Sequence, residues 1–280
     1  RGSIPLAEEN VARLEEYMRA FNQPMSTVNF DEGQYANTGF TQWGASGLAV
    51  AWAEENTRES IFNAFRRKET FATTGTRIAL RFFGGYNLSS IDLNSDSLVS
   101  EAYDKGVTMG SDLLNEDDKT PEFIVWAQRD KNGAPLQRVQ IIKGWIDFNS
   151  GRPSEKVFDI ACSDGLEPDP ITNRCPDNGA KVNINDCSIS SNVGSSELKT
   201  VWRDPEFIPT DKIFYYVRVL ENPTCRWSTW DAIKSGFKPR EDLHETIQER
   251  AWSSPIWYIP EESDVEVVPL GGTIELRTID

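Results

Sequence analysis

The sequence predicts an α+β chain in which one strand–helix–strand unit precedes a mostly antiparallel β-sandwich. Two observations support this fold class. Residues 47–83 contain a short apolar run, an amphipathic helical segment and an alternating strand in succession. From Pro121 onward, runs of strand type alternate with turn-rich connections and few helical segments, which is typical of a β-sandwich.

The strand–helix–strand unit carries local signals that agree with one another. Leu48–Trp52 is an apolar run that predicts a short buried strand. Asn56, with Glu59 three positions later, predicts a helix start, because these side chains can satisfy free N–H groups of the first turn. The basic residues 66–68 suit the negative end of the helix dipole, and alternation over residues 78–82 predicts the next strand. The apolar face expected for the helix comprises Ile61, Phe62, Ala64 and Phe65.

The rest of the chain is assigned by the same rules. Residues 8–21 predict a helix, residues 22–46 a long irregular connection, and residues 231–236 a short helical turn. We expect both faces of the strand at 213–220 to be buried, and a bulge at Gly144. The expected strands of the sandwich are 123–127, 136–146, 157–162, 213–220, 251–259, 265–269 and 273–277.

Composition narrows the class of protein. The chain has 280 residues, 29 Lys and Arg, 44 Asp and Glu, and a net charge of −15. Its apolar and aromatic content indicates a globular protein with a substantial core. An acidic surface repels phosphate backbones, so nucleic acid is not an expected partner. No apolar segment approaches the roughly 20 residues that a membrane-spanning helix needs, so no membrane span is expected.

The four cysteines, all in the β-rich part of the chain, predict a disulfide framework. None of their spacings matches the close pair that structural zinc sites use, which disfavours zinc, and free thiols are the remaining alternative. Of the three pairings that four cysteines allow, we expect Cys162–Cys175 and Cys187–Cys225. Each bond would stabilise the fold by ~2–4 kcal/mol. Disulfides imply an oxidising compartment, so the expected location is periplasmic or secreted.

Several long stretches resemble a known bacterial family. They read AWAEENTRESIFNAFRRKETFATTGTRI, EAYDKGVTMGSDL, LQRVQIIKGWID, FYYVRVLENPTCRWSTWDA and TIQERAWSSPIWY. The first resembles the closing segment of the PHP-like metal-dependent hydrolase barrel, and together they resemble the family DUF3604 over residues 40–259. The resemblance implies that residues 1–77 are the last βα unit of a PHP-like α/β barrel. Residues 78–280 would then form the disulfide-stapled sandwich.

The same resemblance implies a function for the intact protein. It would be a metal-dependent hydrolase, such as a phosphoesterase, with a divalent metal such as Zn or Mn. The presumed metal ligands of the family would lie upstream of Arg1. A site of this type uses several His residues, and this chain has one, so no catalytic, metal or cofactor-binding residue is assigned within it. Whether the chain is an enzyme stays open. The expected partner is an N-terminal polypeptide or barrel half, and a homo-oligomer also stays open.

An aromatic and basic cluster points to a second class of function. Exposed Trp rings on a β-sandwich can stack on sugars, and Arg can pair with carboxylates or phosphates. The alternative is that these side chains fill a seam between the sandwich and the preceding unit. A non-enzymatic extracellular binding or assembly module, for example a glycan-binding one, is therefore the competing hypothesis. The cluster comprises Trp227, Trp230, Arg240, Arg250, Trp252 and Trp257.

Two other candidate sites are weak. Asp92, Asn94 and Asp96 have the spacing of a loose calcium loop, but Ser97 and Tyr103 replace the Gly and Glu that an EF-hand requires. His244 lies among acidic residues, an ordinary surface context that does not mark it as a catalytic base.

Overall fold

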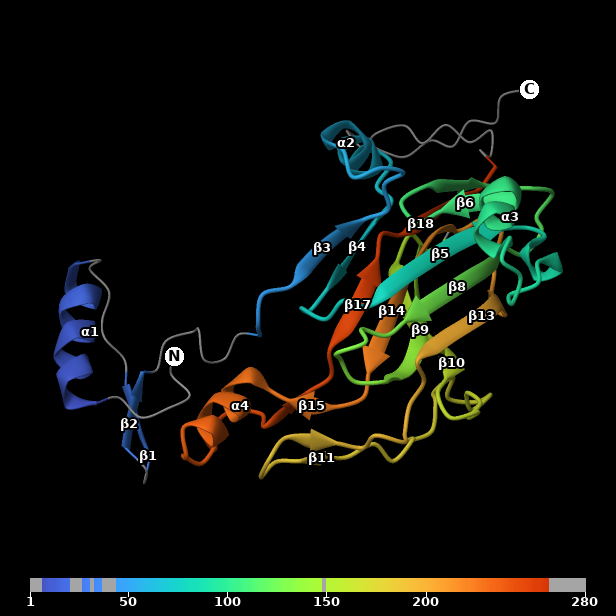
Figure 1. Ribbon diagram of the computed structural model, residues 1–280. Coiled ribbons are helices and arrows are strands. Elements are labelled where there is room, and N and C mark those ends of the chain that lie inside the picture. Colours follow the sequence, from blue (N-terminus) through green and yellow to red (C-terminus); the bar gives the residue numbers. More distant parts are fainter. Residues whose placement is uncertain (1–6, 21–26, 31–32, 37–43, 148–149, 262–280) are drawn as a thin grey trace.

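The computed structural model describes residues 7–20, 27–30, 33–36, 44–147 and 150–261. The strands expected at 265–269 and 273–277 lie outside these residues. Within them, two β-sheets pack face to face as separate layers (Figure 1). A mostly antiparallel sandwich with few helices is therefore confirmed.

The larger sheet forms one layer of the sandwich. Its main path is β10 (Pro153–Cys162), β9 (Leu136–Ile146), β14 (Lys212–Glu221), β17 (Arg250–Ser253), β4 (Thr70–Thr73) and β3 (Leu48–Ala51). Off this path, β18 (Ile256–Ile259) pairs with β14, and β7 (Asp112–Leu114) pairs with β18. The β18–β7 pair is parallel, and the other pairs of this sheet are antiparallel.

The smaller sheet forms the second layer. It is antiparallel, in the order β13 (Glu197–Arg203), β8 (Glu122–Gln128), β5 (Ala79–Gly85) and β6 (Gly106–Thr108). Helix α3 (Leu98–Lys105) and the short 3-10 helix η2 (Leu88–Ser90) cover its outer face, where Leu98, Ala102 and Leu88 pack against Phe83 and Ile124.

Smaller elements complete the chain. The other helices are α1 (Glu8–Ala20), α2 (Arg58–Arg66) and α4 (Trp227–Lys234). Three two-stranded ladders pair β1 (Thr27–Phe30) with β2 (Gly33–Ala36), β11 (Val182–Asn183) with β12 (Ser188–Ile189), and β15 (Thr224–Cys225) with β16 (Thr246–Ile247). The irregular connection expected at 22–46 therefore contains a hairpin, which its polar composition concealed.

The core lies between the two sheets and is dominated by aromatic rings. Phe123 of β8 is its centre, with ring centroids 4.5 Å from Tyr215 and 5.6 Å from Phe82. All three side chains are fully buried. Alternation along β14 supplies the inner face, with Val217 and Val219 also buried.

A buried polar network crosses this core. Lys143 Nζ lies 2.6 Å from Asp204 Oδ2, and both side chains are buried. The Tyr215 hydroxyl donates to the same carboxylate at 2.7 Å. Burial and the Asp204 charge raise the pKa of Tyr215, so its hydroxyl stays protonated and donates. Asp204 is thereby neutralised and hydrogen-bonded, which a buried carboxylate requires.

Three local expectations are wrong. The strand expected to be buried at Leu48–Trp52 is exposed or half-buried, because β3 forms the end of the larger sheet. Gly144 pairs in register with Phe214 and Glu155, and the bulges lie instead at Asp159/Ala161 and Leu220/Glu221. Gly144 is needed for packing, because a Cβ there would lie 2.2 Å from Cζ of Phe214. On the outer face of residues 213–220, Phe214, Tyr216 and Arg218 are only half-buried, whereas Leu220 is buried.

Strands β3 and β4 join the sandwich directly. β3 is antiparallel to β4, and β4 is antiparallel to β17, so both extend the larger sheet. β4 follows α2 before the expected strand begins as β5. The division of the chain at residues 77 and 78 stays a prediction.

Candidate functional site

Helix α2 stands above the end of the larger sheet, between β3 and β4 (Figure 1). Its N-cap is Thr57, whose hydroxyl accepts from the backbone N–H of Ser60 at 3.2 Å. The expected cap, Asn56, is thus off by one residue. Thr57 and Asn56 are both good caps, and sequence alone does not separate neighbours of this kind.

The apolar face of α2 is mostly uncovered. Ala64 is buried, but the side chains of Phe62 and Phe65 are 59% and 50% exposed. Two neighbouring exposed phenylalanines on one short helix form an apolar patch, and such patches mark interaction sites in soluble proteins.

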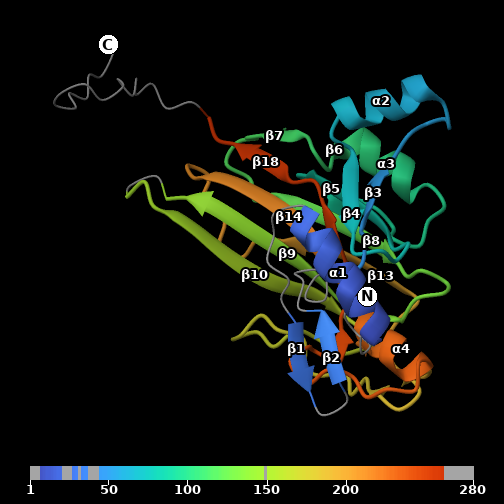
Figure 2. The ribbon, with the colours of Figure 1, turned by 90° about the vertical axis from the view of Figure 1, so that its left-hand side faces the viewer.

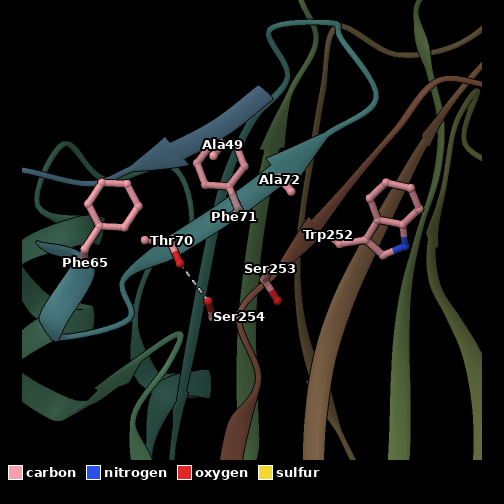
Figure 3. Close-up of a pocket in the computed structure, with 8 residues that line it drawn as sticks. All are labelled: Ala49, Phe65, Thr70, Phe71, Ala72, Trp252, Ser253 and Ser254. Atoms are coloured by element: carbon pink, nitrogen blue, oxygen red, sulfur yellow. Dashed lines mark hydrogen bonds between the residues drawn. The ribbon is translucent and has the colours of Figure 1, made fainter. Parts of the chain in front are cut away.

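A groove lies beside this patch, between α2 and the surface of β3, β4 and β17 (Figure 3). Phe65 stands at one end and Trp252 at the other, and Thr70 Oγ1 and Ser254 Oγ form a 2.9 Å hydrogen bond on its floor. The groove is lined by Ala49, Phe65, Thr70, Phe71, Ala72, Trp252, Ser253 and Ser254. None of these residues has an acidic, basic or imidazole side chain. The groove is therefore suited to binding an apolar surface and offers no general acid or base.

The groove ends at an open strand. Among the described strands, β3 pairs with β4 on one side only and forms the end of the larger sheet. Its other edge leaves backbone N–H and C=O groups available to a further strand. An apolar patch, a groove and an open edge therefore adjoin one another.

A second feature is the outer face of the larger sheet, which Figure 2 faces. Phe214 lies 5.1 Å from the ring of Trp257 and 6.4 Å, stacked, from that of Tyr216. Arg218 pairs in register with Trp252. These half-exposed residues form what we call the outer-face row: Phe214, Tyr216, Arg218, Trp252 and Trp257.

A polar network borders the outer-face row. Arg218 Nε donates to Gln140 Oε1 at 2.6 Å, and Gln140 Nε2 donates to Asp159 Oδ1 at 2.6 Å. Asp159 also accepts from Arg174 and from the backbone N–H of Cys175. The row thus joins aromatic surfaces to fixed hydrogen-bonding groups.

Sequence comparison places the chain in a family. The profile of the family described as "Protein of unknown function (DUF3604)" matches residues 8–260. The chain belongs to the DUF3604 family. No curated protein and no solved structure matches it. The resemblance seen from residue 40 onward is therefore confirmed, and it extends to the N-terminal helix α1.

The predicted aromatic and basic cluster of this DUF3604 chain falls into two groups. Trp227 and Trp230 belong to α4, at one end of the molecule, whereas Trp257 belongs to β18, at the other end (Figures 1 and 2). Arg250 lies 5.8 Å from the ring of Trp252, beside the outer-face row. These residues are close in sequence, which suggested one cluster. The segment between β14 and β17, which contains α4, separates them in space.

Arg240, one residue of the predicted cluster, is buried and holds parts of the fold together. It is buried, donates to both carboxylate oxygens of Asp242 at 2.9 and 2.7 Å, and lies 5.5 Å from the ring of Tyr35. Bidentate pairing of this type holds an Arg rigidly in place. Its guanidinium therefore helps to attach β2 to the α4 region.

Both expected disulfides of the DUF3604 chain are present. Cys162–Cys175 spans a Cα distance of 5.7 Å and ties the end of β10 to the loop that follows. Cys187–Cys225 spans 5.6 Å and ties β15 to the turn before β12. The two bonds secure the irregular segments at this end of the sandwich.

The metal and base candidates find little support in the part of the chain that the structure describes. No group of three or more His, Cys, Asp and Glu residues there could hold a metal ion. Asp92 Oδ1 accepts from the backbone N–H of Asn94 at 2.9 Å, so Asp92 closes a turn. His244 is exposed. Among the described helices, none has the length and apolar character for crossing a membrane.

Proposed function

We propose that this DUF3604 chain is the scaffold portion of a metal-dependent hydrolase of phosphoesterase type. A polypeptide that carries the metal ligands would dock on α2 and on the open edge of β3. The observation that carries this proposal is the exposed apolar face of α2, with Phe62 and Phe65 both about half exposed. Burying the exposed half of each side chain would favour association by about 1 kcal/mol each.

The residue content of the chain supports a scaffold role, with the metal ligands supplied by another polypeptide. Hydrolases that activate water with two or three metal ions need several His and carboxylate ligands, and this chain has one His. The docking polypeptide would therefore supply the ligands for Zn or Mn. The chain itself would supply the apolar face of α2 and the open edge of β3 as the docking surface.

We further propose that β3, α2 and β4 correspond to the closing segment of a PHP-like barrel. In that arrangement β3 would continue into a sheet of the docking polypeptide, and Phe62 and Phe65 would cover that sheet. The two disulfides favour an oxidising compartment such as the periplasm or the exterior.

The test uses the protein from its native source. Its intact mass, its metal content and its hydrolysis of bis(p-nitrophenyl) phosphate would be measured together. We expect a His-rich polypeptide in the same chain or complex, with zinc or manganese bound. Replacing Phe62 and Phe65 with Ser should release that polypeptide or abolish hydrolysis. The matched control, Ile171→Ser, changes an apolar side chain that is 87% exposed elsewhere and should have no effect. Stoichiometric metal and hydrolysis in the isolated 280-residue chain would contradict the proposal.

The outer-face row favours a second function, glycan binding by a non-enzymatic extracellular module. Half-exposed aromatic rings lie beside the half-buried Arg218, which the buried Gln140 holds in place, so this face offers stacking surfaces and a fixed guanidinium to a sugar. A glycan array probed with the wild-type chain and with Trp257→Ala tests this alternative. Binding that Trp257→Ala abolishes would support it, and an array without signal would remove it.

A further inference from the structure

Three loops converge where strand β14 ends, and they enclose the side chain of Glu221. The backbone N–H of Glu221 donates to the carbonyl of Glu249 at 2.9 Å, which holds the segment before β17 in place. The turn between β8 and β9, closed by Gly133 N–H donating to Asp130 O, lies against the same side chain. A Cβ on Gly133 would be 2.9 Å from Glu221 Oε1 and 3.2 Å from Asp130 Cβ. The third loop, between β4 and β5, contributes Thr76.

The carboxyl group of Glu221 is buried without a partner. The residue is 0% exposed, and neither Oε1 nor Oε2 has a hydrogen bond to any residue that the structure describes. Two more buried oxygen atoms share this condition, Oε2 of Glu249 and Oγ1 of Thr76. Buried polar atoms are almost always hydrogen-bonded, so four unpaired oxygens in one place call for a ligand that is not part of the chain.

The local charge is negative. Burial raises the pKa of Glu221 to about 7, and the charges of Glu249 and Asp130 raise it further. The Thr76 hydroxyl and the Ala134 N–H favour the carboxylate, but neither approaches Glu221 with full hydrogen-bond geometry. No Lys or Arg contributes to this shift.

We propose that Glu221, Glu249 and Thr76 bind a hard divalent cation of the Ca²⁺ class. The unpaired atoms are carboxylate and hydroxyl oxygens, which are the ligands that such cations prefer. Glu221 can offer both oxygens, and Asp130 adds negative charge from the neighbouring turn. A bound cation would satisfy all four buried oxygens and compensate the buried charge, which otherwise costs several kcal/mol.

This site is structural and is separate from the proposed hydrolase metals. It would join the β4–β5 loop, the β8–β9 turn and the segment before β17, which are far apart in the sequence. Nothing in the inference depends on the docking polypeptide, so either proposal can fail without the other.

Calcium titration of the chain stripped with EDTA tests the site, with calorimetry for stoichiometry and thermal unfolding for stability. We expect one Ca²⁺ per chain and a rise in melting temperature of about 5–10 °C at 100 times the dissociation constant. Glu221→Gln should abolish the rise, because its amide replaces a ligand oxygen with N–H donors. Should Glu221→Gln not fold, Glu249→Gln is measured instead and should weaken Ca²⁺ binding at least tenfold.

The matched control is Asp92→Asn, in the acidic run that superficially resembles a calcium loop. It should retain both the stoichiometry and the rise in melting temperature. The inference is overturned if the wild-type chain shows neither heat nor stabilisation with Ca²⁺. It is equally overturned if the effect survives in Glu221→Gln, if Glu249→Gln binds Ca²⁺ as tightly as the wild-type chain, or if the effect disappears in Asp92→Asn.

Discussion

The sandwich interior and the helix α2 use the same residue type in opposite ways. Inside the sandwich, Phe82 and Phe123 are fully buried and contact other rings. On α2, Phe62 and Phe65 are about half exposed, although their spacing is that of an ordinary core-facing helix. The described residues fill the interior, whereas they leave the apolar face of α2 about half exposed. The comparison therefore separates residues that maintain the fold from residues that we propose contact a partner.

The largest loss in the free energy of unfolding is expected for a substitution in the interior of the sandwich. Phe123→Ala should lower the free energy of unfolding by about 3–5 kcal/mol, because it removes the ring at the centre of the aromatic cluster and leaves a cavity. Urea denaturation measures this loss. A loss below about 1 kcal/mol would mean that Phe123 contributes no more to stability than the exposed phenylalanines of α2.

Breaking the buried Lys143–Asp204 ion pair should lower the free energy of unfolding slightly less than Phe123→Ala does. Lys143→Met leaves Asp204 buried without its cation and should cost about 3 kcal/mol, since Tyr215 and the Glu206 N–H still donate to that carboxylate. Lys156→Met is the matched control, because Lys156 pairs with Glu206 on the surface and such pairs contribute about 1 kcal/mol or less. Equal losses in the two variants would show that burial does not distinguish these lysines.

Glu221 predicts an unusual dependence of stability on pH in the absence of calcium. Its pKa is raised from 4.5 to about 7, so the folded chain binds one more proton than the unfolded chain between these values. Stability is then fully present below pH 4.5 and falls by about 2–3 kcal/mol as the pH rises to 7. Urea denaturation in EDTA across this range measures the slope. The slope should vanish in Glu221→Gln, and a slope of opposite sign would refute the assignment.

The smallest effect is expected on α2. Phe65→Ala should lower the free energy of unfolding of the isolated chain by about 1 kcal/mol or less, because half of the side chain is already exposed and Ala has the higher helix propensity. The same denaturation measurement applies. A loss comparable with that of Phe123→Ala would break the comparison, since it would place Phe65 in the fold and not in an interface.

Strong local patterns predicted much of the fold. Strand β9 has the bounds expected at 136–146, because a long apolar run between turn signals leaves little choice of register. Helix α3 was missed, since eight residues are too few for a helical period to stand out and its Tyr103 packs against Phe83 only in the folded chain. Strand β4 was missed because residues 70–73 are too short to show an alternation.

The candidate sites were harder to predict than the fold. The disulfides were predicted, because each bond connects cysteines whose spacing and loop context limit the choice. The convergence of Thr76, Glu221 and Glu249 could not be foreseen, because it depends on three loops that only the folded sheet brings together. The sequence indicates that Phe62 and Phe65 need a covering sheet that the chain does not offer before residue 47, but an amphipathic pattern does not state how much of each ring stays exposed.

The contact between Phe214 and Gly144 has a consequence for how the sheet opens. The ring lies over the glycine near the C-terminal end of β9, so the backbone there is screened from water by the core on one side and by the ring on the other. Amide hydrogens of neighbouring residues should then exchange with solvent more slowly than those at strand ends that no ring covers. A single glycine, by admitting the ring, thus protects a strand end that would otherwise open first.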